Sequence, residues 1–95
     1  MAYKKRTDAN QSEIVSALRK VGASVLDLSK VGHSCPDLLV GFRGKNYLLE
    51  IKDGAKKPSA RKLRDNQAEF FAAWSGQVSK AESVDDALRA IGAIR

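Results

Sequence analysis

The sequence predicts a small α/β domain in which helices flank both faces of a mixed central sheet. Segments that favour helix and strand alternate along the chain in the order αβββαβα. The central segment, residues 36–52, is apolar on both of its alternating faces except at Asp37, Glu50 and Lys52. Successive strand residues face opposite sides, so apolar residues on both faces require helices on both faces.

The first helix is predicted from an apolar stripe. Ile14 and Leu18 lie four residues apart and share one helical face. Asp8 or Asn10 precedes the stripe, and either side chain is suited to cap the helix start. A strand over residues 23–28 follows, because Val25 there alternates with polar neighbours.

Residues 36–52 have the pattern of a β-hairpin. Strand-forming residues flank Arg43 and Gly44, which supply the turn chemistry. A turn at these two residues pairs positions whose numbers sum to 87, which sets Asp37 opposite Glu50. Directly opposed residues have Cβ atoms roughly 5 Å apart, so we expect the two carboxylates to lie within reach of one ion.

The second half of the chain begins with a polar, basic loop over residues 53–64. A helix over residues 65–74 and a short strand over residues 77–81 are expected next. Ser83 then caps a last helix, whose first turn is acidic as the helix dipole favours.

Composition indicates one domain over residues 8–95, after a basic, flexible arm over residues 1–7. The net charge of +6 predicts an anionic partner, for which nucleic acid is the default. A single cysteine excludes an internal disulfide and fits a reducing cytosol, and no apolar run is long enough to span a bilayer.

The hairpin residues suit metal-assisted hydrolysis of a phosphodiester. Asp37 and Glu50 offer the hard oxygen ligands that Mg²⁺ or Mn²⁺ prefers, and the carbonyl of Ile51 is a candidate third ligand. Lys52 would hold or deprotonate the attacking water and steady the phosphate. The alternative is structural: Asp37 caps the strand start, and Glu50 and Lys52 form a weak surface ion pair.

Two helical residues extend this candidate site. Glu13 lies beside the stripe of the first helix and is a further candidate metal ligand, directly or through water; alternatively it only satisfies the helix dipole. Gln67 occupies a position on the apolar stripe of the second helix, where a buried amide must find partners. It is expected to orient Lys52, the water or a phosphate, or else to reach solvent from the edge of the stripe.

A basic patch directly follows the hairpin and is expected to track a DNA backbone with salt-sensitive affinity. It consists of Lys56, Lys57, Arg61, Lys62 and Arg64. Phe70, Phe71 and Trp74 of the second helix are predicted to be core residues and not a platform for stacking bases.

These residues resemble the motif of the PD-(D/E)XK nuclease superfamily. The matching positions are Pro36-Asp37, Glu50-Ile51-Lys52 and the helical Glu13. The stretches 31–41 and 48–52, with Gln67 in the next helix, are similar to the VRR-NUC branch of that superfamily. The likeness spans about residues 10–92. One departure is Arg64 after Leu63, where relatives often have Ser or Thr, so Asp65 or another residue must cap the helix.

The resemblance implies a restriction-endonuclease-like core and a Mg²⁺- or Mn²⁺-dependent DNA endonuclease. It implies that the site comprises Glu13, Asp37, Glu50, Lys52 and Gln67. It further implies a homodimer similar to Holliday-junction resolvases, which cuts branched DNA in the cytoplasm of a bacterial or phage-infected cell. A nicking or restriction-type nuclease without junction preference, and a non-catalytic DNA-binding module, are the alternatives.

Overall fold

The computed structural model describes residues 9–95, so the predicted arm over residues 1–7 and the candidate cap Asp8 lie outside the described residues. Within the described part of the chain, no helix combines the length and apolar character needed to cross a bilayer. The elements are α1 Gln11–Lys20, β1 Ser24–Asp27, β2 Leu38–Phe42, β3 Lys45–Ile51, α2 Pro58–Arg61, α3 Asp65–Ala73, β4 Val78–Ala81 and α4 Val84–Ala90.

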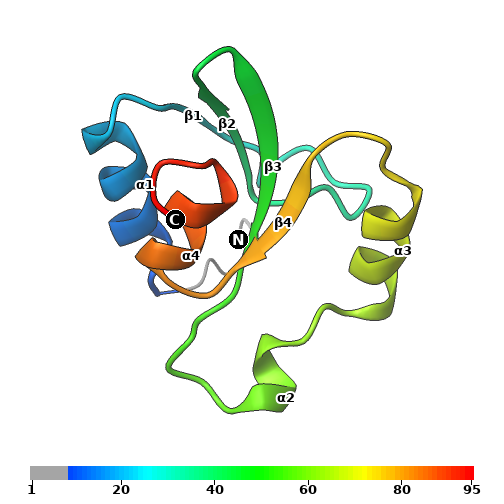
Figure 1. Cartoon of the computed structure of the whole chain (residues 1–95). Coiled ribbons are helices and arrows are strands. Elements are labelled where there is room, and N and C mark those ends of the chain that lie inside the picture. The colour runs from blue at the N-terminus through cyan, green and yellow to red at the C-terminus, as the bar shows by residue number, and fades with distance from the viewer. Residues whose placement is uncertain (1–8) are drawn as a thin grey trace, which may run out of the picture.

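Four strands form one mixed sheet in the order β1-β2-β3-β4 (Figure 1). The first three strands are antiparallel, and β4 runs parallel to β3. A parallel neighbour requires a crossover connection, and the chain makes it through α2 and α3. The predicted α/β class, mixed sheet and flanking helices are confirmed; the short α2 is an addition within the predicted basic loop.

The hairpin has the predicted register. Leu38 pairs with Leu49, and Phe42 pairs with Lys45, which leaves Arg43 and Gly44 as the two turn residues. Both have positive φ angles, 51° and 80°. This is the backbone of a type I′ turn, whose twist matches that of the flanking strands.

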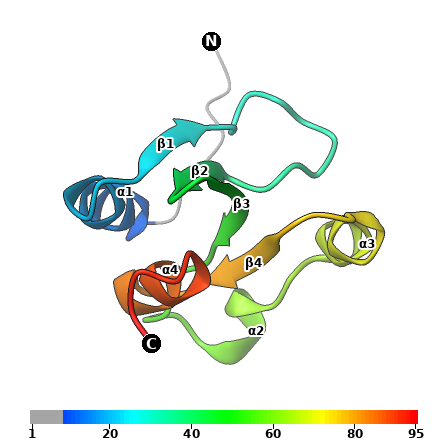
Figure 2. The ribbon, with the colours of Figure 1, turned by 45° about the horizontal axis from the view of Figure 1, so that its top comes forward.

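One face of the sheet packs on α1 and α4 (Figure 2). Ile14 and Leu18 of α1 and Leu38, Leu49 and Ile51 of the hairpin are each 0% exposed. These are the apolar residues that the helical and strand periodicities predicted to face a core. The main hydrophobic core therefore lies between α1, α4 and this face of the sheet.

The structure bears out the predicted side-chain cap of α4. The Ser83 Oγ accepts a hydrogen bond from the backbone N–H of Asp86 at 3.1 Å. Asn10 lies directly before α1, but its side chain makes no capping hydrogen bond. Its amide group donates instead to the backbone carbonyls of Lys52 and Glu82, so the capping role predicted for Asn10 is wrong.

The opposite face of the sheet lies toward α3 (Figures 1 and 2). Gln67 of α3 is buried, whereas Phe70 and Phe71 are only half-buried and Trp74 is 47% exposed. The prediction that these three aromatic residues belong to the core is therefore wrong: Trp74 is exposed, and the half-buried Phe70 and Phe71 are not part of the main core. Helical spacing identified the apolar stripe, but the sheet residues and loop beside α3 do not cover its C-terminal end.

Candidate functional site

Glu50 near the end of β3 and Lys52 directly after it project on the face opposite the main core. Their neighbours Leu49 and Ile51 pack into that core, so the alternation of a strand turns the two charged residues toward α3. Glu50 is only 5% exposed and Lys52 only 9%. The Nζ atom of Lys52 lies 3.7 Å from Oε2 of Glu50. This pair is buried, which rules out the alternative of an exposed surface ion pair.

Asp37 lies one residue before β2 and is also buried, at 8% exposure. Its Oδ2 accepts a hydrogen bond of 2.7 Å from the backbone N–H of Ile51. Continuing the hairpin register by one residue places Asp37 opposite Glu50. The structure therefore brings Asp37, Glu50 and Lys52 together, and Asp37 is held against the strand that carries the other two.

Gln67 joins the buried charges to each other. Its Oε1 accepts a hydrogen bond of 3.0 Å from Nζ of Lys52, and its Nε2 donates one of 3.2 Å to Oε2 of Glu50. The lysine can only donate and an ionised carboxylate can only accept, so these two partners fix the orientation of the amide. Gln67 thereby satisfies two charged groups that would be costly to bury without partners.

The same amide stabilises the start of α3. Oε1 of Gln67 also accepts a 2.9 Å hydrogen bond from the backbone N–H of Arg64, the residue that precedes the helix. Of the predicted alternatives, Asp65 or another residue as cap, the structure has the second: Arg64 is the N-cap residue, and Asp65 is the first residue of α3. Because one oxygen contacts both Lys52 and the helix start, the position of α3 is coupled to that of the lysine.

The oxygen atoms around Asp37 fit a hard divalent cation. In a strand, the N–H and C=O groups of one residue point to the same edge, so the Ile51 carbonyl faces the side on which Asp37 lies. Two carboxylates and this carbonyl form a donor set typical of Mg²⁺ or Mn²⁺. Among residues 9–95, no three acidic, histidine or cysteine side chains gather as a metal site, so the third protein ligand would be the carbonyl.

Glu13 is not part of this cluster. It is exposed on α1, which packs on the other face of the sheet. There it lines a hollow of about 470 Å³ with Asp53, Gly54 and Glu82, beyond the end of β3. The structure gives no support to direct metal ligation by Glu13. Ligation through a water molecule stays a prediction.

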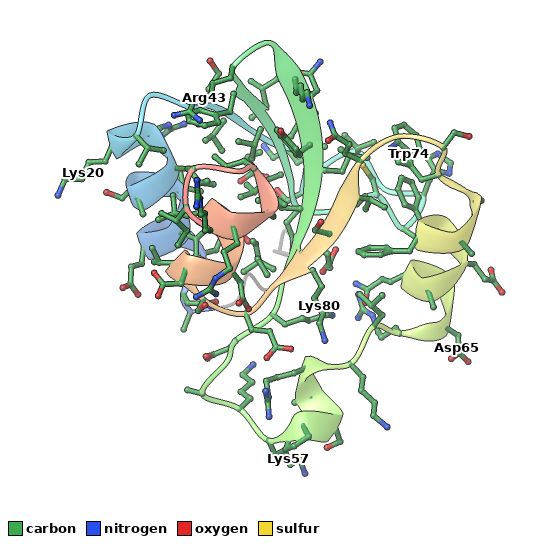
Figure 3. All side chains as sticks on the ribbon, in the orientation of Figure 1. Lys20, Arg43, Lys57, Asp65, Trp74 and Lys80 are labelled. Atoms are coloured by element: carbon green, nitrogen blue, oxygen red, sulfur yellow. The ribbon has the colours of Figure 1, made fainter. Side chains whose placement is uncertain are left out.

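The predicted basic patch divides into two groups. Lys56, Lys57, Lys62 and Arg64 are exposed. Arg61 instead donates a 2.8 Å hydrogen bond from its Nη1 to Oε1 of Glu82. Arg61 therefore attaches α2 to the end of β4. The exposed cations remain at the surface, and Figure 3 labels one of them, Lys57, at the start of α2 and away from the sheet.

Glu82 links this basic segment to the sheet and was not singled out from the sequence. Its second carboxylate oxygen lies 2.9 Å from Nζ of Lys80, and Lys80 also donates to the carbonyl of Arg61. The hydrogen bonds from Lys80 and Arg61 lower the pKa of Glu82 below the ordinary glutamate value. Glu82 therefore stays ionised and paired near neutral pH.

Asn10 is a second residue that sequence reasoning did not place at the site. Its Nδ2 donates hydrogen bonds of 3.1 Å to the carbonyl of Lys52 and 3.2 Å to that of Glu82. It therefore ties together the ends of β3 and β4 directly beside the catalytic candidate Lys52. An asparagine before a helix suggests a cap, so only the long-range contacts could have revealed this role.

Comparison of the chain with family models, with curated proteins and with solved structures gives no match. The class of protein that the fold and the site define is a small α/β domain with a buried acid–acid–lysine cluster. Any activity must be argued from that cluster.

Proposed function

We propose that this protein is a Mg²⁺- or Mn²⁺-dependent DNA endonuclease of the VRR-NUC type, within the PD-(D/E)XK superfamily. The observation that carries the proposal is the buried set of Asp37, Glu50 and Lys52, with Gln67 hydrogen-bonded to both Lys52 and Glu50. A buried pair of opposite charges on an otherwise apolar sheet face adds little to the free energy of unfolding. Places where a chain gives up an apolar contact in this way are expected at functional sites.

Each residue has a role that its contacts support. The carboxylates of Asp37 and Glu50 and the carbonyl of Ile51 would hold the cation, which supplies charge stabilisation at the phosphoryl oxygen. Lys52 orients the attacking water and steadies the phosphate, because its three N–H donors suit oxygen acceptors. Gln67 is a positioning residue, since it fixes Nζ of Lys52 at 3.0 Å from its own oxygen.

DNA is the proposed substrate because the chain is basic and the exposed lysines flank the cluster. Lys56 and Lys57 follow the end of β3 closely in the chain, and Lys62 and Arg64 directly precede α3, which carries Gln67. A DNA backbone with one phosphate at Lys52 would meet these cations on either side of α2. The resemblance to VRR-NUC proteins favours branched DNA as the preferred form, and the cytoplasm of a bacterial or phage-infected cell as the setting.

A homodimer is proposed because cutting paired strands of a junction needs two active sites. The sheet has an open edge at β1, a short strand on which Leu26 is 60% exposed. Edge strands of this kind are commonly covered by a partner. Sedimentation should therefore give the mass of two chains; the mass of one chain on a protein that still cuts junctions would contradict the dimer.

The proposal is tested by incubating the protein with a labelled four-way junction or a linear duplex of equal length. We expect cleavage in Mg²⁺ or Mn²⁺ and none in EDTA, with the junction cut faster. Asp37→Asn should lower the rate by at least about a hundredfold, whereas Asp65→Asn, an exposed change of the same kind on α3, should not.

Three outcomes would revise the proposal. Equal cleavage of junction and duplex would favour a nuclease without junction preference. Binding of DNA without any metal-dependent cleavage would favour a non-catalytic DNA-binding module. Full activity of Asp37→Asn would reject the assigned site.

A further inference from the structure

An apolar groove of about 510 Å³ lies on the same face of the sheet as the candidate site. One wall is α3, with Phe70 and Trp74; the floor is Leu39 and Leu48 of the hairpin; and the other wall is the loop over residues 28–35. Figure 3 shows Trp74 at the end of α3 remote from Asp65. A groove of this volume lies within the range of small-molecule sites.

The aromatic wall consists of two stacked rings, one of which is partly exposed. The rings of Phe70 and Trp74 are stacked, with centroids 5.3 Å apart and planes inclined by 14°. Trp74 is nevertheless 47% exposed. Its indole is seated against Gly76, where a Cβ atom would approach Nε1 to 2.8 Å. The ring is therefore positioned by the chain while one part of it stays accessible.

The opposite wall is held in a disfavoured backbone conformation. Gly32, His33 and Ser34 have successive φ angles of 79°, 56° and 60°. Only glycine adopts this left-handed region without cost, so His33 and Ser34 are unusual there. Such residues concentrate at ligand-binding segments, where the surrounding structure maintains them.

The groove lies next to the proposed catalytic cluster on the same face of the sheet. Leu48 on its floor is two residues from Glu50 on the same face of β3, a separation of about 7 Å. Phe70 is one turn of α3 beyond Gln67, and Trp74 is about 10 Å beyond Gln67 along the helix. When a DNA phosphate contacts Lys52, the base of that nucleotide or of its neighbour would therefore be close enough to enter the aromatic groove.

We propose that this groove binds one unstacked nucleobase of the DNA strand whose phosphate occupies the Asp37–Glu50–Lys52 site. The inference rests on the proposed function. A base is favoured over an apolar peptide because the groove adjoins a phosphate site in a basic chain, and stacked aromatic residues bind the π face of any base. Asn46, His33 and Gln77 on its lining add polar groups that suit base edges.

Trp74 is the only tryptophan of the chain, so its emission reports on the groove alone. The wild-type protein is titrated in EDTA with an oligothymidylate and with an abasic strand that carries the same number of phosphates. We expect the oligothymidylate to quench the emission and to bind about tenfold more tightly than the abasic strand.

Two variants, assayed by competition against a fluorescent strand, separate stacking from charge. Trp74→Ala should bind both strands with the affinity that the wild type shows for the abasic strand. Trp74→Phe, which keeps an aromatic ring, should retain most of the preference for bases. Because Trp74 is exposed, neither change should unfold the protein, and circular dichroism checks this.

Equal affinity for the two strands, with unchanged emission, would overturn the groove proposal. The proposal would also be overturned if the Trp74 emission changed with protein concentration but not on addition of a strand with bases. That result would show that a second copy of the chain covers Trp74. The experiment separates failure of the groove proposal from failure of the proposed function. If the protein binds the strand with bases more tightly but never cuts DNA, the groove proposal stands and the nuclease proposal fails. A protein that cuts DNA without discriminating bases loses only the groove.

Discussion

The two faces of the sheet differ in the residues they bury. The face under α1 and α4 buries aliphatic side chains, including Ile14, Leu18 and Leu49, at 0% exposure. The face toward α3 buries Glu50, Lys52 and Gln67, yet leaves Trp74 half exposed. One face therefore buries apolar surface and exposes little of it, whereas the other buries charge and leaves an aromatic ring in solvent.

This difference indicates that one face of the sheet stabilises the fold and the other carries the proposed function. Apolar burial is the dominant favourable term in folding, so the face under α1 and α4 supplies most of the stability. A buried ion pair adds little to stability even when it is hydrogen-bonded, and the exposed part of an aromatic ring adds no apolar burial. The face toward α3 is therefore the face on which we place the chemistry and the ligand.

The largest effect expected is the loss of a core side chain. Leu49→Ala removes a fully buried residue and should lower the free energy of unfolding by about 2–5 kcal/mol. The matched change Leu26→Ala, at a residue 60% exposed, should lower it by less than about 0.5 kcal/mol. Urea denaturation followed by circular dichroism measures both. Similar losses at the two positions would contradict the division between the faces.

Next in size is the effect of removing the amide that bridges the buried charges. Gln67→Ala should lower the cleavage rate by roughly a hundredfold, because Lys52 loses the oxygen that positions it. Glu69→Ala, an exposed change on the same helix, should leave the rate unchanged. If Gln67→Ala cut DNA at the wild-type rate, Gln67 would have a structural role only.

A smaller effect concerns acid stability. The pKa of Glu82 is lowered in the folded state by Lys80 and Arg61, so its ionised form stabilises the fold above the ordinary glutamate pKa near 4.5. That contribution is lost as the pH falls below 4.5 through the lowered pKa. Glu82→Gln should flatten the dependence of stability on pH in this acid range, measured by urea denaturation from pH 6 downward. An unchanged pH profile would show that the Arg61 and Lys80 pairs add nothing, and Glu69→Gln serves as the control.

The smallest effect concerns DNA affinity. Lys57→Ala should weaken binding to all DNA forms alike and reduce the slope of log affinity against log salt by about one. Lys20→Ala removes an equal charge from α1, which Figure 3 shows on the side of the molecule away from α3, and should change the slope little. Equal changes in the two variants would indicate that net charge alone attracts the DNA.

Much of the fold follows from local patterns. The alternation of the hairpin and the turn at Arg43 and Gly44 predicted the register, and the register brought Asp37 and Glu50 together. Gln67 was recognisable because an amide on an apolar stripe needs a buried partner, and the structure supplies two in Lys52 and Glu50.

The remaining features depend on contacts between distant segments. Periodicity placed Trp74 on an apolar stripe, but whether a sheet or loop covers that stripe is decided by tertiary packing. Asn10 and Arg61 have partners 72 and 21 residues away at Glu82, which no local pattern indicates. Glu13 is exposed on α1, which packs on the opposite face of the sheet from Glu50 and Lys52.

The central claim is that the buried charges serve phosphodiester hydrolysis and not folding. It is tested most directly by the cleavage rate of Glu50→Gln in Mg²⁺, measured beside its urea midpoint. The amide keeps an oxygen that can accept from Gln67, but Lys52 loses its ionic partner, so the midpoint should fall while the variant stays folded in the absence of urea. The rate should fall by at least about a hundredfold, because a carboxylate ligand is lost. A variant that cuts DNA as fast as the wild type, or a wild type that never cuts, would contradict the claim.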